Sequence, residues 1–272
     1  MEDKQFDVLY KQSQDVGKND SDYIGKFNFL KQASKYRPQA DEAKPLARHI
    51  GKVYFIFKLE LIYTAALVLG MMQNIEKAVV IEEVIFSFGG ITALVLIFAS
   101  LSLVYVARQH DNLILGVVAC LFLCMVIATE LFTVIFLMDN SDIIFECLIL
   151  TITVFGVSAI YGLVTKRDIT GWGPALFTAL ISSIVALVLN LFFQNSLVQN
   201  VIMFADIIIF TLYTMYDNQM LKFNFLSKYR DDIPDTNTSW WLLALDGSID
   251  LYADFINLFL DILSLFGSSD DD

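Results

Sequence analysis

Long blocks of apolar residues constrain the fold of this 272-residue chain more strongly than any other feature of its sequence. A helix of about 20 residues can cross a bilayer core of roughly 30 Å. Backbone groups in lipid must be hydrogen-bonded within their own segment, so each block is expected to be helical. The sequence therefore predicts an all-α membrane protein with seven transmembrane helices: residues 53–72, 83–106, 113–138, 143–164, 174–193, 199–216 and 241–266.

These blocks divide the chain into three parts. Residues 1–52 are predicted to be a polar cytosolic arm, 53–267 the transmembrane domain and 268–272 a short acidic tail. Of the 18 Lys and Arg residues, sixteen precede the first block or lie in the even-numbered connections. Cytosolic segments carry an excess of these residues, so the amino terminus is predicted to be cytosolic and the carboxyl terminus on the opposite side. The formal net charge of −12 argues against a nucleic-acid partner.

Carboxylates occur inside several apolar blocks, although a charge at the centre of a membrane helix costs about 2.5–3.5 kcal/mol to insert. The last block carries most of them. At 100° per residue its polar side chains fall within about 80° of one another, which places them on one helix face. This predicted acidic row runs across the membrane and consists of Asp246, Asp250, Asp254, Asn257 and Asp261.

An acidic row of this kind favours a path for a cation or for protons. Carboxylate oxygens are suitable ligands for a hard cation such as Ca²⁺. The alternative is structural, because protonated acids can also join helices through hydrogen bonds. Asp217 and Asp254 are the first candidates for the ion pathway, for pH sensing and for transient Ca²⁺ binding. Further candidates for the pathway are Asp250, Asp246, Asn257, Glu130 and Asp206.

The sequence shows no pattern of an enzyme or of a bound cofactor. The three cysteines lack the spacing of a zinc site or a disulfide framework, and small core residues are their expected role. There is no glycine-rich phosphate loop and no nucleophile elbow. We therefore expect no catalytic residue and no cofactor, with Ca²⁺ or protons as the permeant or regulatory ions.

Four segments resemble the Bax inhibitor motif family, and the opening of the first span resembles its Lifeguard-like branch. They are "RHIGKVYFIFKLELIYTA" (48–65), "TITVFGVSAIYGLVTKRDIT" (151–170), "YDNQ" (216–219) and "LYADFINLFLDILSLFG" (251–267). The resemblance covers residues 46 to 267. Its most specific parts are the segment 151–170 and the "DFIN" of the last block.

The resemblance implies a seven-helix fold whose last helix is central and surrounded by the other six. It also implies a pH-sensitive Ca²⁺ leak, an influence on calcium homeostasis and, in eukaryotes, restraint of cell death. In that family two aspartates share a proton and gate the pore, and they map onto Asp217 and Asp254. The implied location is the endoplasmic reticulum or Golgi membrane in a eukaryote and the inner membrane in a bacterium.

The sequence departs from the family pattern at several positions. Glu130 stands where relatives have a small residue, and Asp246 and Asp250 replace neutral residues. A basic residue of the second helix that pairs with the aspartates in some relatives has no clear counterpart, because Arg108 lies near the end of its predicted span. The connection between the last two spans is long ("LKFNFLSKYRDDIPDTNTSW"), which does not favour a contact between Asp217 and Asp254.

Two other functions remain open at this point. One is a non-conducting membrane scaffold that binds cell-death regulators or channels, and such a role is compatible with a leak. The other is an intramembrane aspartyl protease, in which two carboxyl groups act as general base and acid. Such proteases need "GxGD" around the second aspartate, whereas this chain has "LYAD", and its only "PAL" (174–176) precedes both aspartates.

Overall fold

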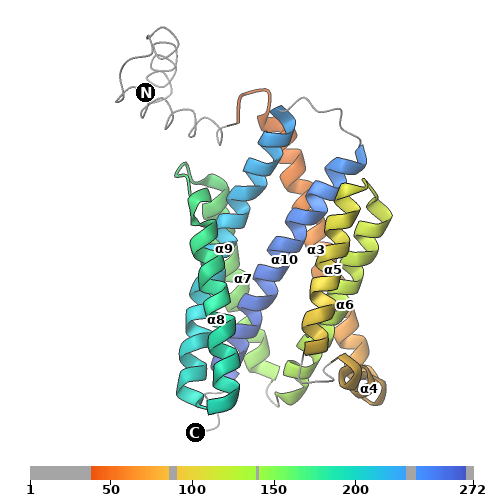
Figure 1. The fold of residues 1–272 in the computed structure, drawn as a ribbon, viewed down its shortest axis with the longest axis vertical. Helices are drawn as coiled ribbons and strands as arrows, with labels where there is room; N and C mark the ends of the chain where they lie inside the picture. Colours follow the sequence, from red (N-terminus) through yellow and green to blue (C-terminus); the bar gives the residue numbers. More distant parts are fainter. Residues whose placement is uncertain (1–37, 86–90, 139–140, 231–236, 268–272) are drawn as a thin grey trace.

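All regular elements in the part of the chain described by the computed structural model, residues 38–85, 91–138, 141–230 and 237–267, are helices (Figure 1). A short 3₁₀ turn, η1, precedes α8. In chain order the elements are α3 (Ala43–Gln73), α4 (Ile75–Ile85), α5 (Ile91–Gln109), α6 (Leu113–Leu137), α7 (Ser141–Val164), η1 (Thr170–Trp172), α8 (Gly173–Phe193), α9 (Ser196–Arg230) and α10 (Asn237–Gly267).

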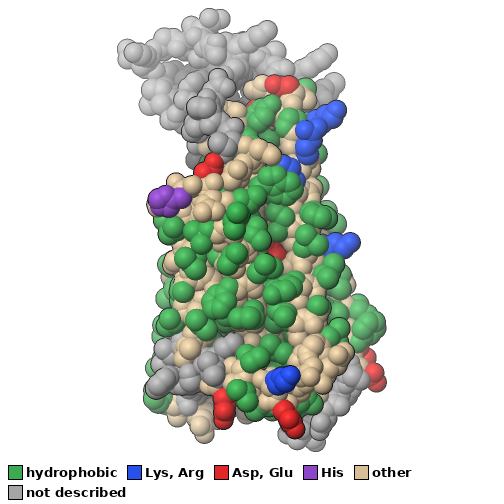
Figure 2. Space-filling model, turned by 90° about the vertical axis from the view of Figure 1, so that its right-hand side faces the viewer, with side chains coloured by type: hydrophobic (Ala, Val, Ile, Leu, Met, Phe, Trp, Pro, Cys, Tyr) green, Lys and Arg blue, Asp and Glu red, His purple; other side chains and the backbone are tan. Residues whose placement is uncertain are grey.

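Among the described helices, five are long and apolar enough to cross a membrane, namely α3, α6, α7, α8 with the turn before it, and α9. The apolar part of α5 is shorter, Val95–Gln109. In α10 four aspartates lower the hydropathy, so it does not join this group. Large apolar side chains such as Phe98, Val157 and Ile160 are exposed on the outer surface. Figure 2 shows apolar side chains over the middle of one face, as expected for a multi-pass protein in contact with lipid.

The second predicted span, residues 83–106, is not a single helix. Its first residues belong to α4, which ends at Ile85, and α5 begins at Ile91. The sequence of this block already contains a helix-weakening feature, the Gly89–Gly90 pair. In Figure 1, α4 lies at the end of the bundle opposite to the start of α3.

The structure also corrects the end of the sixth predicted span, which was placed at residue 216. Helix α9 continues for fourteen residues beyond it, to Arg230, and α10 begins at Asn237. The long predicted connection is therefore mostly helix. Its polar residues are compatible with a helix because Leu221 and Phe225, four residues apart, are buried on one face together with Leu226 beside them.

The first helix begins at Ala43, so it includes the last ten residues of the predicted arm. The rest of the arm up to residue 37, and the acidic tail 268–272, lie outside the described residues. The start of α3, the end of α9 and the start of α10 lie at one end of the bundle, and α10 ends at the other (Figure 1). Arg230 on α9 forms an ion pair with Glu42 just before α3, which holds these ends together.

Helix α10 packs against α9, α3, α7, α6 and α5, whereas α8 packs against α9 and η1. Figure 1 shows α10 running obliquely between α9 and α5. Its residues supply much of the main hydrophobic core, and Leu251, Tyr252, Leu258 and Leu263 are completely buried. The acidic row is thus carried by the helix that makes contacts with five others.

Helices α7 and α9 approach each other closely at Gly162. A Cβ atom at this position would lie 2.3 Å from the backbone oxygen of Met215 and 2.8 Å from the Cβ of Asn218. The turn after α7 is also fastened to α9, because Gln219 accepts a hydrogen bond from the Ile169 amide (2.8 Å) and donates one to a backbone oxygen of that turn (2.7 Å). These contacts fix the position of the α9 segment that carries Asp217.

Candidate ion pathway

The two first candidates, Asp217 of α9 and Asp254 of α10, are brought together inside the bundle. Their carboxyl groups lie within hydrogen-bonding reach of each other, and Thr214 is also within reach of Asp254. Only 4% of Asp254 is exposed, and its Oδ2 atom has no hydrogen-bond partner among the described residues. The contact exists because α9 continues past residue 216, so Asp217 lies well inside a helix and not at its end.

Asn218, the residue after Asp217, ties this part of α9 to α3. Its Oδ1 atom accepts a hydrogen bond of 2.6 Å from the hydroxyl of Tyr54, and its amide group donates one of 2.8 Å to the Thr214 backbone oxygen. Asn218 is completely buried, so breaking these bonds would leave an unpaired amide in the core. The aspartate pair is therefore set on a segment that other side chains hold in place.

Arg108, in the last turn of α5, forms an ion pair with Asp246 of α10. This partner lies outside the Asp217–Asp254 pair, for which the sequence predicted no clear basic counterpart. A long, flexible side chain allows the guanidinium group to extend from a helix end to a neighbouring helix. Both side chains are partly exposed, at 46% and 33%. The pair marks the end of the row at which α10 begins.

Asp250 lies one turn further along α10 and is exposed, in contrast to the buried residues on either side of it. Asp217, Asp246 and Arg108 all lie close enough to influence it electrostatically. Along the chain Asp250 thus lies between Asp246 of the ion pair and Asp254 of the aspartate pair. Asp246 and Asp250 are accessible, whereas Asp254 one turn further is buried.

Two further acids face each other nearer the opposite end of the bundle. Asp206 of α9 is buried, Asp261 of α10 is partly buried, and the two are close enough to interact electrostatically. Asp206 Oδ1 and Asp261 Oδ2 have no hydrogen-bond partner among the described residues. Asn257 lies between the two aspartate pairs and donates a hydrogen bond to the backbone of its own helix at Ala253 (2.8 Å). The predicted row is therefore opposed by acids of α9 at two levels.

Glu130 is not part of this arrangement. It lies half-buried on α6, and within the described ranges it has no interaction with the acids of α10. The acids that do lie along α10 form no cluster of three or more metal-ligating groups in the part of the chain that the structure describes. The arrangement thus offers paired carboxyl groups at successive levels, and no closed ligand cage.

The sequence interpretation missed a polar cluster between α3 and the opposite side of α10. Glu60 Oε1 accepts hydrogen bonds from the Ser248 hydroxyl (2.9 Å) and the Cys120 thiol (3.1 Å). One turn further along both helices, the Thr64 and Tyr252 hydroxyls are 2.7 Å apart. The shared spacing of four residues on the two helices was a usable signal. The expectation that the cysteines are core residues is confirmed, since all three are buried with free thiols.

Comparisons with known proteins agree with the earlier resemblance. A family model described as inhibitor of apoptosis-promoting Bax1 matches residues 46–271. The inner membrane protein YbhL of Escherichia coli K12 is 34% identical over 176 residues, which cover 64% of this chain and 73% of that protein. An uncharacterized membrane protein of Streptococcus pyogenes serotype M3 is 35% identical over 127 residues, covering 47% and 52%. An uncharacterized protein of Helicobacter pylori is 36% identical over 124 residues, covering 46% and 47%.

Proposed function

This chain belongs to the family of inhibitors of apoptosis-promoting Bax1, and we propose that it forms a pH-sensitive pathway for Ca²⁺ leak across its membrane. The role is transport and involves no catalytic residue. In this proposal seven helices span the membrane, α10 is the central one, and the amino terminus faces the cytosol. YbhL is named an inner membrane protein, and a bacterial chain of this kind would have the same location.

The contact between Asp217 and Asp254 is the observation that carries the proposal. Two carboxylates in contact in an apolar interior repel each other strongly, so a shared proton stabilises the contact and the two groups titrate as a pair. With the proton present, α9 and α10 are held together and the pathway is closed. Loss of the proton leaves like charges that separate the helices or attract a cation.

The other acids of α10 extend this gate into a path. Asp246 and Asp250 lie between the surface and the gate, and Asn257 lies beyond it. The Arg108 ion pair with Asp246 occupies the entrance and would have to open for a cation to enter. Carboxylate and amide oxygens along the path replace part of the water shell that Ca²⁺ loses. Any effect on cell death would follow from the change in Ca²⁺ distribution.

The test is Ca²⁺ flux into liposomes that contain only the purified protein, measured at two pH values. Flux of the wild type should rise with pH, because deprotonation opens the pair. Asp254→Asn should abolish the pH dependence and lower the flux, while the fold stays intact because Asn keeps the size and hydrogen bonding. Asp217→Asn should remove the pH dependence and leave flux, since Asp254 remains as a ligand.

Asp261→Asn serves as a matched control on the same helix face and should change little, because it lies beyond the gate. Wild-type pH dependence in Asp254→Asn would contradict the gating mechanism. Absence of flux from folded wild-type protein at both pH values would contradict the leak itself. That second outcome would favour the scaffold that binds cell-death regulators or channels.

A further inference from the structure

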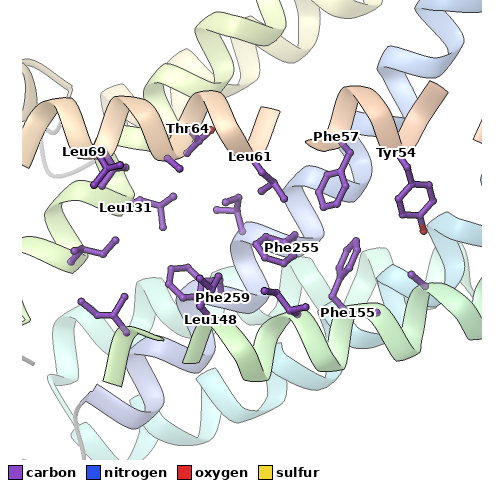
Figure 3. A pocket seen from close by; sticks show the side chains of 18 of the residues that line it. Tyr54, Phe57, Leu61, Thr64, Leu69, Leu131, Leu148, Phe155, Phe255 and Phe259 are labelled. Carbon is purple, nitrogen blue, oxygen red and sulfur yellow. The ribbon is translucent and has the colours of Figure 1, made fainter. Parts of the chain in front are cut away.

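An apolar groove lies between α3 and α7, on the side of α10 opposite to the acidic row (Figure 3). Its volume is about 870 Å³. Phe255 and Phe259 of α10 form its floor, and Leu131 of α6 lies at one end. The groove is open to the outside, because Leu69 and Ile160 on its two rims are 63% and 62% exposed. It is therefore an outward-facing hollow within the membrane-spanning part of the bundle.

The chemistry of the groove excludes water as a stable occupant. Among the described residues that line it, only Tyr54 and Thr64 have polar side chains. The Tyr54 hydroxyl donates to Asn218, and the Thr64 hydroxyl pairs with that of Tyr252, so both hydroxyls already have a partner. A buried water needs two to four polar partners, which this surface does not provide. The groove has the size and apolar character of sites that bind small hydrophobic ligands.

A single basic residue, Lys58, lies on the face of α3 that lines the groove. Lys58 comes four residues after Tyr54 and seven before Ala65, so helical spacing puts it beside these two lining residues. Its side chain is exposed and has no hydrogen bond or ion pair with any other described residue. A lone lysine inside an apolar helix extends its ammonium group toward the membrane interface, where phosphates lie.

The length of the groove matches one leaflet of a bilayer. Along α3 the groove runs from Tyr54 to Leu69, a rise of about 22 Å at 1.5 Å per residue. Half of a bilayer of about 40–45 Å, headgroup regions included, is about 20–22 Å. Lys58 lies one turn inside the Tyr54 end, so a phosphate held by its extended side chain would direct an attached acyl chain along the part of the groove from Lys58 to Leu69.

We propose that the groove between α3 and α7 is a binding site for one membrane phospholipid, with an acyl chain over Phe255 and Phe259 and the phosphate at Lys58. Charge complementarity and leaflet length identify this occupant. The bound chain touches α10 directly, on the face opposite to Asp250 and Asp254. The site does not depend on the proposed leak, because its occupancy is measured without any flux.

The experiment uses the full chain in vesicles that contain a phospholipid with a photoactivatable diazirine at the end of one acyl chain. After irradiation, mass spectrometry maps the labelled peptides. Labels should concentrate at the groove, on α3 near Val68 and on α7 near Leu148, and not on the outer face of α8 around Val185. Equal labelling of the α8 face would show a general lipid shell and overturn the site.

Two matched pairs of variants test whether the groove itself is responsible. Gly156 lines the groove with open space around its Cβ position, whereas Val157 is 65% exposed and lies outside the groove. Ala65 and Ala66 on α3 form the same kind of pair. Gly156→Phe and Ala65→Phe should fill the groove and remove its labelling, while Val157→Phe and Ala66→Phe should retain it.

The two filling variants lie on different helices, so a folding defect in one still leaves the other to decide. Unchanged labelling in a folded filling variant would refute the site. Lys58→Gln should lower labelling by about fivefold, the change expected from losing one interfacial cation–anion contact of roughly 1 kcal/mol. Full labelling in Lys58→Gln would overturn the assignment of the phosphate to this residue.

Discussion

The two faces of α10 are held in different ways. Its carboxylate face consists of Asp246, Asp250, Asp254, Asn257 and Asp261, and its aromatic face of Ser248, Tyr252, Phe255 and Phe259. On the aromatic face Phe255 packs edge-on against Phe57 and Phe155, with ring centroids 6.0 and 5.4 Å apart. Such contacts are favourable in every protonation state. The aromatic face therefore determines where α10 lies.

The carboxylate face is incompletely satisfied. Asp254 and Asp261 each have one carboxyl oxygen without a hydrogen-bond partner among the described residues, and Asp250 is exposed. Unpaired polar atoms in a low-dielectric interior cost free energy and respond to any proton or cation that reaches them. The aromatic face is therefore suited to fixing the position of α10, and the carboxylate face to changing its protonation or binding a cation.

The largest loss of stability is expected at the close contact between α9 and α7. This contact positions Asp217 next to the carboxylate face of α10. In Gly162→Ala the new methyl group would lie 2.3 Å from the Met215 backbone oxygen, so the two helices must separate. Overpacking against backbone should cost about 3 kcal/mol of unfolding free energy. The pH dependence of flux should disappear as well, since Asp217 moves with α9.

Gly156→Ala is the control for Gly162→Ala, since it adds the same methyl group to the same helix with nothing within 4 Å. It should leave stability unchanged or raise it by about 0.5 kcal/mol, because alanine favours a helix more than glycine does. Unfolding of both variants in mixed detergent micelles measures the difference. Equal stability of the two variants would show that the close α7–α9 contact does not position the pair.

A pair of substitutions on α10 compares its faces directly. Phe255→Ala should cost about 2 kcal/mol, less than in a soluble core because lipid is as apolar as the lost ring. Asp250→Asn should change stability by less than about 0.5 kcal/mol, since this side chain is exposed. The same Asp250→Asn variant should lower Ca²⁺ flux. If Asp250→Asn destabilised the protein as much as Phe255→Ala, the division between the faces would be wrong.

Most helices could be predicted from the sequence because their apolar blocks leave a single solution for the backbone in lipid. The exceptions have physical reasons. The block 83–106 was treated as uniformly apolar, although it begins at Glu83 and contains two adjacent glycines. The second half of α9 is amphipathic, so a search for continuous apolar residues stops before Asn218, Leu221 and Phe225. Its continuation is supported by tertiary packing, which the sequence does not show directly.

The candidate site was predictable to the extent that it depends on one helix. The acidic row follows from the spacing of α10 alone. The contact between Asp217 and Asp254 depends on the length of α9, and the pairing of Arg108 with Asp246 on the reach of a flexible side chain. Glu130 was predicted as a candidate but lies apart from the acids of α10, because an acid on a neighbouring helix need not face the same interior. Residue spacing within one helix could not predict which side chains of different helices are in contact.

The smallest expected effect concerns a third acidic group, which lies on neither face of α10 and must be separated from their pH response. Glu42 precedes α3 and accepts hydrogen bonds of 2.7 Å from both Nε and an NH₂ group of Arg230. These bonds, together with one from the Gln39 amide, hold the pKa of Glu42 below its ordinary value despite the burial of its side chain. A lowered pKa means that the pair stabilises the fold at neutral pH.

That stabilisation should be present above about pH 4.3, the ordinary pKa of glutamate, and be lost as the pH falls through the lower pKa of Glu42. The expected size is about 1 kcal/mol, because Arg230 is partly exposed to solvent.

Thermal midpoints between pH 6 and pH 3 should fall less steeply in Glu42→Gln, and the exposed Glu76→Gln should behave as wild type. Arg230→Gln should match Glu42→Gln, and the double variant should lose no more than either one. Additive losses would show that the two side chains act independently. Altered pH dependence of flux in Glu42→Gln would mean that the response is not confined to the carboxylate face.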